Sequence, residues 1–526
     1  MTTLLPPTSP STGAAPFQPD AAGPGLYVHI PFCSAICPYC DFSVLKGGEE
    51  AKERFLQTLL AEVDLVAGQG GLWADGAGIS RASASTSSSL TSPTLKKGGI
   101  EGGISSSASP TLTPQSGVGG IEGGISSSAS PTLTPQSGVG GTEGGASLTG
   151  TASAPFDTLY LGGGTPTALT TEQLHRLLEH LRLRLPVAPD ARLFLEANPE
   201  DVRPETLAEW RQLGVTFLSL GVQSFDDDAL AFLGRRHNGN QAKRAVEEAL
   251  AAGFETVSLD LIFGYRGHSE ELWLRDLDRA SALGTQHLSA YQLTLHEGTP
   301  FGFRHRRGET LLVEEDPQAR LFALAQQHLG DGGLAPYEVS NYAASGAHRS
   351  QHNQKYWHHV PYLGIGPSAH SYWPQQNGES ETTTMTPTEP MAPMAPMAPM
   401  APMAPMAPMA QRGRRFWNHR KVGAWTEAIE AGELPVAGDE HLGADSLALE
   451  AVLLSLRTVD GVNLDRLQQR FGIDLLAQNQ VVVASLAKEG FLGLREQGGE
   501  RFLQPTPQGL AVADALVGRL AVELPG

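Results

Sequence analysis

Cysteine is almost missing from this chain of 526 residues. The chain has three cysteines, and all of them lie within one short segment, at Cys33, Cys37 and Cys40. An odd number of thiols in one cluster excludes the framework of disulfide bonds that stabilises small secreted proteins. The amino-terminal segment also lacks a basic stretch followed by a continuous apolar run, so we expect no secretory signal. These absences predict a protein of the reducing cytoplasm.

Long hydrophobic runs and an excess of positive charge are missing as well. No window reaches about 18 consecutive apolar residues, so the sequence predicts no transmembrane helix. The formal net charge is −19, which argues against a protein held on nucleic acid by its overall field. Hydrophobic residues still make up 40% of the chain, which is enough for a folded core.

Three segments are too rich in glycine, proline and small polar residues to bury a core. Residues 1–25 predict a disordered leader, and residues 70–154 predict a disordered insert. The insert contains the 21-residue unit IEGGISSSASPTLTPQSGVGG twice in succession. Residues 376–410 predict a linker with a Met-Ala-Pro repeat, either disordered or a polyproline II spacer, because proline at every third position excludes an α-helix.

Apolar and β-branched runs alternate with helix-like patterns between these segments. Repeated strand–helix units are typical of an α/β fold with a parallel sheet, and we predict a partial (βα)6 barrel over residues 26–375. An open sheet of the same units is the alternative. The predicted strands lie at 26–30, 158–163, 192–198, 216–222, 256–264 and 287–295.

Residues 411–526 predict a second, smaller α+β domain. From Ser446 the pattern is three helices, a β-ribbon and a further helix, which resembles a winged-helix module. The helix expected at 475–490 offers only Lys488 for contact with phosphate, so the pattern favours packing or partner docking over DNA binding.

The three cysteines directly follow the first predicted strand. In parallel barrels, chemistry collects at the carboxyl ends of the strands. A [4Fe–4S] cluster can take three thiolates and leave its fourth iron open to a small molecule. A structural zinc would need a further ligand from a distant histidine or carboxylate. Pro31 and Pro38 interrupt helix formation, so the thiols can converge from an irregular loop.

The spacing C-x3-C-x2-C resembles the signature of radical SAM proteins. The segments YVHIPFC, GGGTPT, LEANPE, LGVQSF, LDLIFG and GIGPSAH extend this to a resemblance with the oxygen-independent coproporphyrinogen III oxidase family. It implies that the three cysteines hold a [4Fe–4S] cluster whose open iron binds S-adenosylmethionine (SAM). The residues that it implies at the SAM site are Tyr27, Tyr39, Gly163, Gly164, Thr165, Glu196, Gln223, Arg235 and Asp260.

Two branches of that family share these motifs. The oxidases carry a further cysteine two residues after the third, and this chain has Phe42 there. The heme-chaperone (HemW) branch carries the motif H-N-x-x-Y-W, which this chain matches with His352, Asn353, Tyr356 and Trp357. The resemblance makes His352 a candidate ligand of heme iron, with His348, His358, His359 and His370 as alternatives. The alternative is that the motif binds no iron and only packs over the mouth of the barrel.

The resemblance therefore implies a heme chaperone that binds heme, a [4Fe–4S] cluster and SAM, and that passes heme to an acceptor protein. The alternative is oxidative decarboxylation of coproporphyrinogen III to protoporphyrinogen IX, which Phe42 and the HNQKYW segment disfavour. SAM is either cleaved or acts as a switch, so we assign no catalytic residue. The expected partners also include a second copy of this chain, in a homodimer, and a membrane protein that it contacts transiently.

Overall fold

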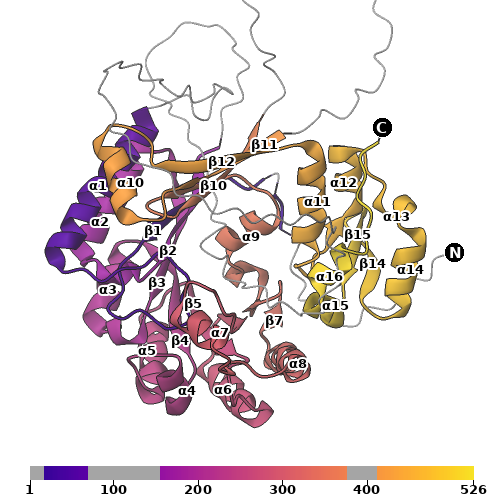
Figure 1. Ribbon diagram of the computed structural model, residues 1–526, viewed down its shortest axis with the longest axis horizontal. Coiled ribbons are helices and arrows are strands. Elements are labelled where there is room, and N and C mark those ends of the chain that lie inside the picture. Colours follow the sequence, from indigo (N-terminus) through magenta and orange to yellow (C-terminus); the bar gives the residue numbers. More distant parts are fainter. Residues whose placement is uncertain (1–16, 20, 69–153, 376–411, 526) are drawn as a thin grey trace, which may run out of the picture.

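The structure is a computed structural model that describes residues 17–19, 21–68, 154–375 and 412–525 (Figure 1). The predicted linker, the predicted insert up to residue 153 and residues 1–16 of the predicted leader lie outside these ranges. The described end of the leader is packed against the fold. Phe17 stacks on His358 with 5.1 Å between ring centroids, and the carbonyl of Pro24 accepts a hydrogen bond from Asp157 N at 3.0 Å.

Parallel strands in sequence order form the centre of the described sheet. The first, second and fifth of these strands are almost entirely buried, as expected for strands inside a parallel sheet. This arrangement confirms the predicted barrel of βα units. The parallel strands are β1 (Gly25–Ile30), β2 (Phe156–Gly163), β3 (Val187–Ala197), β4 (Val215–Gln223), β5 (Thr256–Phe263) and β6 (His287–Gln292).

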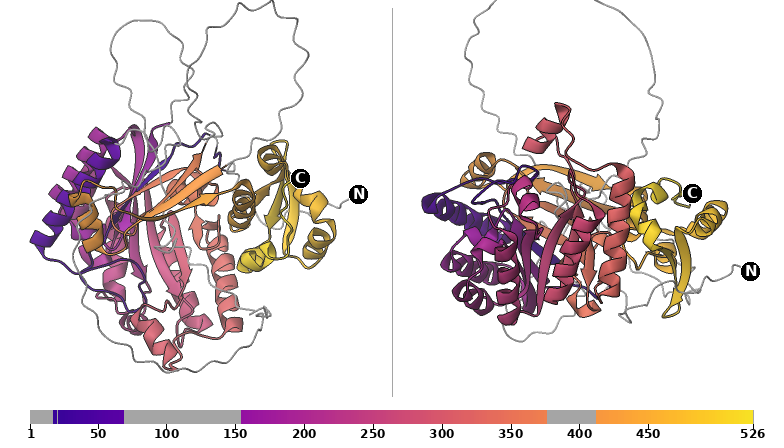
Figure 2. Two further views of the ribbon diagram at one scale, coloured as in Figure 1. Left: turned by 45° about the horizontal axis from the view of Figure 1, so that its top comes forward. Right: turned by 90° about the horizontal axis from the view of Figure 1, so that it is seen from below.

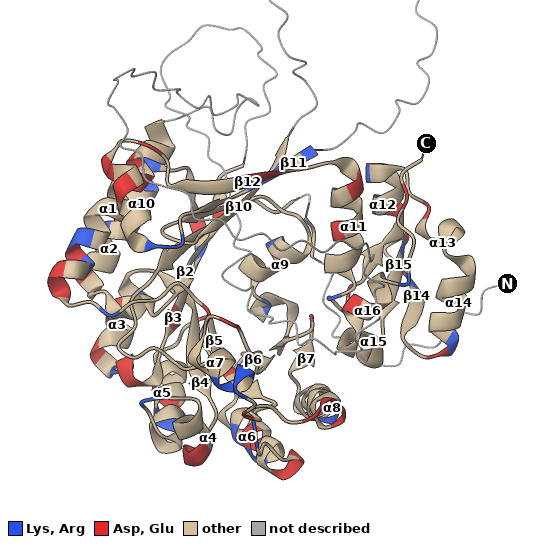
Figure 3. Cartoon of the chain, viewed as in Figure 1, with Lys and Arg blue, Asp and Glu red and all other residues tan. Residues whose placement is uncertain are grey.

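Helices cover the outer face of this sheet (Figures 1 and 2). Among the described helices, none combines the length and apolar composition needed to cross a bilayer. Charged residues of both signs are interspersed along these outer helices (Figure 3). The helices are α1 (Glu49–Gly68), α2 (Thr171–Arg184), α3 (Pro204–Gln212), α4 (Asp227–Phe232), α5 (Gly239–Ala251), α6 (Glu270–Leu283) and α8 (Glu315–Asp331).

Local sequence signals explain where several of these helices begin. Thr170 caps α2 by accepting a hydrogen bond from Gln173 N, and the Gln173 side chain returns the contact to the backbone of Thr170. Ser269 caps α6 by accepting a hydrogen bond from Leu272 N, and Gly284 ends that helix in the left-handed conformation. The buried apolar side chains of α1, α2, α3, α5, α6 and α8 pack with those of the sheet and build the main core.

The sheet continues beyond the parallel strands, and this corrects one predicted boundary. Residues 412–442 were expected in the carboxyl-terminal domain, but they extend the main sheet as antiparallel strands next to β10, while α10 (Val422–Glu430) packs on α1. The additional strands are β7 (Ala335–Pro336), β8 (Asn341–Ala343), β9 (Tyr362–Ile365), β10 (His370–Gln375), β11 (Arg412–Asn418) and β12 (Val436–Leu442).

The remaining carboxyl-terminal residues form a smaller unit with helices around a short sheet, as the winged-helix pattern predicted (Figure 2). Its ribbon of β14 and β15 is antiparallel. The unit comprises α11 (Ala444–Ser455), β13 (Val462–Asn463), α12 (Leu464–Phe471), α13 (Leu475–Gln478), α14 (Gln480–Lys488), β14 (Leu492–Gln497), β15 (Glu500–Pro505), α15 (Pro507–Ala511) and α16 (Ala513–Val517).

Two short helices lie at opposite ends of the parallel strands. α9 (Gln351–Trp357) contacts β2 at its amino-terminal end, where Thr158 is hydrogen-bonded to His352. α7 (Pro300–Arg306) begins beside the cysteine segment that follows β1, because Phe301 N donates to the Pro38 carbonyl at 2.8 Å. The space between these ends contains the candidate site.

Candidate functional site

A cavity of about 300 Å³ collects nearly all of the residues that the sequence predicted at a cofactor site. Its lining includes the three cysteines at one end and Asn353 and Tyr356 of α9 at the other. All nine predicted SAM residues line it: Tyr27, Tyr39, Gly163, Gly164, Thr165, Glu196, Gln223, Arg235 and Asp260. Two predicted heme-motif residues, His352 and Trp357, are absent from this lining.

The cysteine loop, residues 33–45, is closed at its base by backbone hydrogen bonds. Leu45 N donates to the Pro31 carbonyl at 2.7 Å, and Cys33 N donates to the Leu45 carbonyl at 3.0 Å. The three thiols are free and half-buried. Burial raises the pKa of the Cys40 thiol to about 12. Thiolates at this site therefore need positive charge beside them, such as a metal ion supplies.

The glycine turn at the end of β2 is attached to the start of the cysteine loop. Gly164 N donates to the Ile30 carbonyl at 2.9 Å, and Thr165 N donates to the Phe32 carbonyl at 2.7 Å. A Cβ on Gly164 would lie 2.8 Å from both carbonyl oxygens, which is too close for any side chain. The resemblance placed these glycines at the SAM site. The structure shows that Gly164 must also lack a side chain because it lies close to the start of the cysteine loop.

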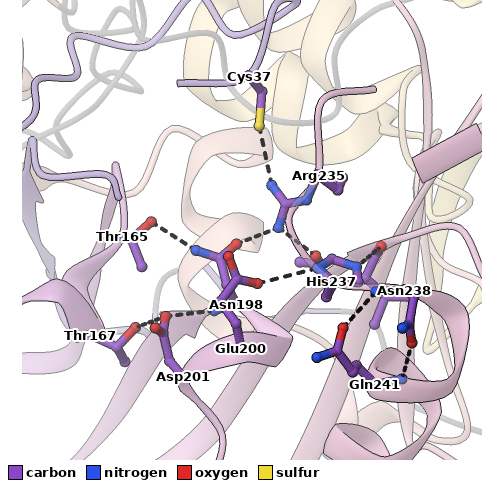
Figure 4. Close-up of polar contacts among 12 residues, drawn as sticks. Cys37, Thr165, Thr167, Asn198, Glu200, Asp201, Arg235, His237, Asn238 and Gln241 are labelled. Atoms are coloured by element: carbon purple, nitrogen blue, oxygen red, sulfur yellow. Dashed lines mark hydrogen bonds and ion pairs between the residues drawn. The ribbon is translucent and has the colours of Figure 1, made fainter. Parts of the chain in front are cut away.

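A chain of hydrogen bonds connects two of the thiols across the cavity wall, and Figure 4 shows the part from Cys37 to Thr165. Arg235 Nη1 lies 3.4 Å from Cys37 Sγ, and its Nη2 donates to Asn198 Oδ1. Asn198 Nδ2 donates to Thr165 Oγ1 at 2.9 Å, and Thr165 Oγ1 lies 3.6 Å from Cys33 Sγ. Donors thus face both sulfur atoms, an arrangement that stabilises the thiolate form.

Sequence reasoning did not assign three residues that support this chain. Asn198 links Arg235 to Thr165, as described above. Glu200 Oε2 lies 3.2 Å from His237 Nδ1, whose Nε2 is hydrogen-bonded to the Val222 carbonyl at 2.9 Å (Figure 4). The LEANPE segment contains both Asn198 and Glu200, so their position after β3 was the available signal.

Two half-buried acidic residues face the cavity. Glu196 accepts hydrogen bonds from Tyr160 Oη at 2.7 Å and Gly163 N at 3.2 Å, and burial raises its pKa to about 7. Asp260 accepts from Ser219 Oγ at 3.2 Å, and burial raises its pKa to about 6. Buried carboxyls with raised pKa values are stabilised in the charged form by a cation. This part of the cavity therefore suits a positively charged ligand.

The aromatic and strained residues of the lining come from separate elements. Tyr27 of β1 has its hydroxyl 3.1 Å from His29 Nδ1, and Tyr39 in the cysteine loop packs on Phe301 of α7 with ring centroids 6.4 Å apart. Gln223 has a φ of +69° and follows a register shift between β4 and β5. Strained non-glycine residues of this kind cluster at ligand sites.

His352, the predicted candidate ligand of heme iron, lies in the core within α9 and has a hydrogen-bond partner at each ring nitrogen. Its ring is fully buried, with Nδ1 3.0 Å from Thr158 Oγ1 and Nε2 2.8 Å from Tyr356 Oη. Burial holds the pKa of His352 well below its usual range. Both ring nitrogens are engaged, so neither can bind an iron atom in this conformation. His352 instead holds the hydroxyl of Tyr356, which lines the cavity.

The four alternative histidines also lie outside the cavity lining. His348 Nδ1 lies 2.9 Å from Thr256 Oγ1, and His359 Nε2 lies 3.2 Å from Glu450 Oε2. His358 stacks on Phe17, and His370 stacks on Trp417 with ring centroids 5.7 Å apart. All four were alternative ligand candidates from the sequence, and in the structure each contacts a partner that lies outside the cavity lining.

Known proteins resemble this chain along most of its length. Residues 150–280 match the radical SAM superfamily, and residues 442–512 match the HemN C-terminal domain. The chain is 30% identical over 511 residues to the heme chaperone HemW of Mycobacterium tuberculosis, covering 97% of this chain and 96% of the relative. The chain belongs to the HemW family of the radical SAM superfamily.

Further likenesses agree with that family. HemW of Escherichia coli is 39% identical over 229 residues, which cover 44% of this chain and 59% of the relative. The coproporphyrinogen III oxidase HemN of Escherichia coli has a similar fold, with a TM-score of 0.60 at 16% identity over 94% of this chain and 89% of that chain. The match to the HemN C-terminal domain begins at residue 442, where the main sheet ends.

Radical SAM proteins use a [4Fe–4S] cluster and SAM, and the HemW family brings this expectation to the present chain. The cavity has suitable chemistry for both groups. Three free thiols face one space, and the carboxyl groups of Glu196 and Asp260 suit the positively charged sulfonium group of SAM.

Proposed function

We propose that this protein is a heme chaperone that binds heme and transfers it to an acceptor protein, with a [4Fe–4S] cluster and SAM as its cofactors. The observation that carries the proposal is the likeness to a heme chaperone over 97% of the chain. Phe42 supports it, because the oxidases that resemble this chain have a cysteine at the corresponding position.

The three cysteines hold the cluster in this proposal, and the cluster when bound offers an open iron to the amino and carboxylate groups of SAM. Arg235 and Thr165 donate hydrogen bonds toward two of the sulfur atoms. Glu196 and Asp260 face the positive sulfonium group of SAM in this proposal, and the glycine turn leaves room for the amino-acid end of SAM. Gln223, Tyr27 and Tyr39 complete the wall.

The HNQKYW segment has a supporting role in this proposal. His352 is a positioning residue, because its ring fixes the hydroxyl of Tyr356 at the inner end of the cavity. Trp357 is buried, and Asn353 lines the cavity beside Tyr356. The segment therefore shapes the cavity and supplies no iron ligand from His352.

A hemin titration of anaerobically reconstituted protein tests the function. We expect saturable binding seen in the Soret band and transfer of the bound heme to apomyoglobin. The same protein with SAM, dithionite and coproporphyrinogen III is expected to form no protoporphyrinogen. Formation of that product without saturable hemin binding would establish the oxidase and overturn the proposal.

Two variants separate a positioning role of His352 from a ligand role. His352→Ala and Tyr356→Phe both remove the hydrogen bond between these side chains. If His352 positions Tyr356, both variants weaken binding to a similar degree and leave the Soret maximum of bound heme unchanged. A shifted Soret maximum in His352→Ala alone would show that the histidine binds iron after a rearrangement.

A further inference from the structure

The mouth of the cavity has exposed apolar side chains. In the described part of the chain few large apolar residues are exposed, and two of them, Ile36 at 45% and Phe42 at 38%, lie in the cysteine loop. Both line the cavity, as does Val44. Exposed apolar surface beside a cavity is typical of a ligand or partner contact.

Charge is distributed unevenly along the same cavity. The inner wall contains the buried carboxyls of Glu196 and Asp260, which repel any further carboxylate. Arg236 lines the cavity as well, but its side chain is exposed and forms no ion pair among the described residues. An anionic group is therefore disfavoured beside Glu196 and Asp260 and favoured at Arg236.

Further positive charge lies next to the cysteine loop. The backbone of α7 is bonded to this loop through Phe301 N and the Pro38 carbonyl. Figure 3 shows a basic segment at α7, which contains Arg304 and Arg306. Both arginines are paired, with Glu309 and Glu297 respectively, so Arg236 remains the stronger candidate for contact with an anion.

These features fit a flat apolar molecule with carboxylates at its edge. We propose that heme binds at the cavity mouth, with its macrocycle against Phe42 and Ile36 and one propionate paired with Arg236. The inference rests on the proposed function and adds a location to it.

SAM and heme then occupy successive parts of one cavity. The inner carboxyls attract the positive groups of SAM, and the mouth accepts the apolar and anionic heme. Phe42 stands where the related oxidases have a cysteine, so this position supplies apolar contact area in place of a thiol. An aromatic ring of this kind offers a broad surface for stacking on a macrocycle.

Hemin titrations of variants test this location. We expect Phe42→Ser and Arg236→Glu each to weaken hemin binding about tenfold, with unchanged iron content and SAM affinity. Phe42→Leu keeps apolar surface and is expected to bind hemin nearly as wild type, which separates lost contact from a disturbed loop. Val481→Ser and Arg495→Glu, at exposed positions of the carboxyl-terminal unit, are matched controls and are expected to bind as wild type.

A second ligand tests the ion pair directly. Hemin dimethyl ester has no free propionate, so it is expected to bind wild type less tightly than hemin does. Arg236→Glu is expected to lose this preference for the free acid. If wild type binds no hemin, the proposed function fails. If wild type binds hemin and both mouth variants bind it equally well, or lose SAM affinity in place of hemin affinity, the location is wrong while the function stands.

Discussion

Backbone geometry at single residues sets the shape of the cavity wall. Gln223 adopts a φ of +69°, a conformation that costs a residue with a Cβ about 1–3 kcal/mol. Gly163 also has a positive φ, +102°, and avoids this cost because it has no Cβ. Both residues line the cavity from neighbouring parts of the sheet. The strain at Gln223 is therefore compensated by the surrounding strands, which aim its side chain at the ligand space.

Gly164→Ala tests the contact between the glycine turn and the cysteine loop. A Cβ at this position would meet the carbonyl oxygens of Ile30 and Phe32, and backbone cannot move aside as a flexible side chain can. We expect a loss of about 1–3 kcal/mol in the free energy of unfolding and poorer cluster retention. Urea unfolding and iron analysis after reconstitution measure the two effects.

Gly423→Ala is the matched control for this substitution. Gly423 lies in α10, and a Cβ there would meet nothing within 4 Å. Alanine is the better helix former, so the control is expected to gain up to about 1 kcal/mol with unchanged iron content. Equal effects of the two substitutions would contradict the steric explanation.

Individual residues also show what the sequence could and could not predict. The cavity-lining residues were predictable, because carboxyl ends of parallel strands meet at one edge of a sheet and the family motifs lie there. The surroundings of His352 were not predictable, because they depend on which atoms form hydrogen bonds with its ring nitrogens. Thr158, which bonds its Nδ1, is 194 residues away in the sequence. No local pattern could show that this nitrogen is occupied.

At the scale of elements, one buried carboxylate joins the first helix to the antiparallel end of the sheet. Glu62 of α1 accepts hydrogen bonds from Gly366 N at 2.8 Å and Trp425 Nε1 at 3.0 Å through one oxygen. Its other oxygen accepts from Asn418 Nδ2 at 2.6 Å. The partners lie near β9, β11 and α10, so a single side chain fixes how these elements meet.

Glu62→Gln tests how this junction depends on pH. Burial raises the pKa of Glu62 to about 7, above the 4.5 that is usual for a glutamate side chain. The stabilisation from the protonated form is therefore complete below about pH 4.5 and is lost as the pH rises through about 7. Glutamine stays neutral, so the unfolding free energy of wild type is expected to fall by about 2–3 kcal/mol relative to the variant between pH 5 and 8.

Urea unfolding of the two proteins at several pH values gives this difference directly, and all other titrating groups cancel in it. Glu50→Gln is a control on the same helix, since the side chain of Glu50 is 88% exposed. Its difference from wild type is expected to stay constant over the same range. A constant difference for Glu62→Gln as well would contradict the assignment.

The order of elements was predictable in the parallel part of the sheet and not at its antiparallel end. Each βα unit has its own local pattern, so the strands and helices from β1 to β6 follow from periodicity. The strands β11 and β12 pair with β10, which precedes them across residues 376–411. Pairing across such a separation leaves no local signal, and for this reason residues 412–442 were placed in the carboxyl-terminal domain and not in the main sheet.

Across the whole molecule, the carboxyl-terminal unit shares a core with the cavity floor. One hydrophobic cluster contains Leu447 of α11 together with Tyr356, Tyr362 and Tyr372. The rings of Tyr356 and Tyr362 are perpendicular with centroids 4.9 Å apart, and those of Tyr362 and Tyr372 are 5.7 Å apart. A continuous row of packed rings thus connects α11 to the residue that lines the inner end of the cavity.

This row predicts that the two units are coupled in binding as well as in stability. Leu447 and Leu486 are both fully buried in the carboxyl-terminal unit, but Leu447 belongs to α11, which packs on α9, and Leu486 belongs to α14. Leu447→Ala and Leu486→Ala are each expected to lower the free energy of unfolding by about 2–5 kcal/mol. Only Leu447→Ala is expected to loosen the rings behind Tyr356 and to weaken SAM binding several-fold.

Calorimetric titration with SAM, at a temperature where both variants remain folded, measures the coupling apart from the loss of stability. Equal stability losses with unequal SAM affinities would show that packing through the tyrosine row carries the effect, because the two substitutions remove the same atoms. If both variants keep the wild-type affinity, the carboxyl-terminal unit only supports the fold. If both lose it equally, general loosening of the unit is the cause, and the row of rings has no special role.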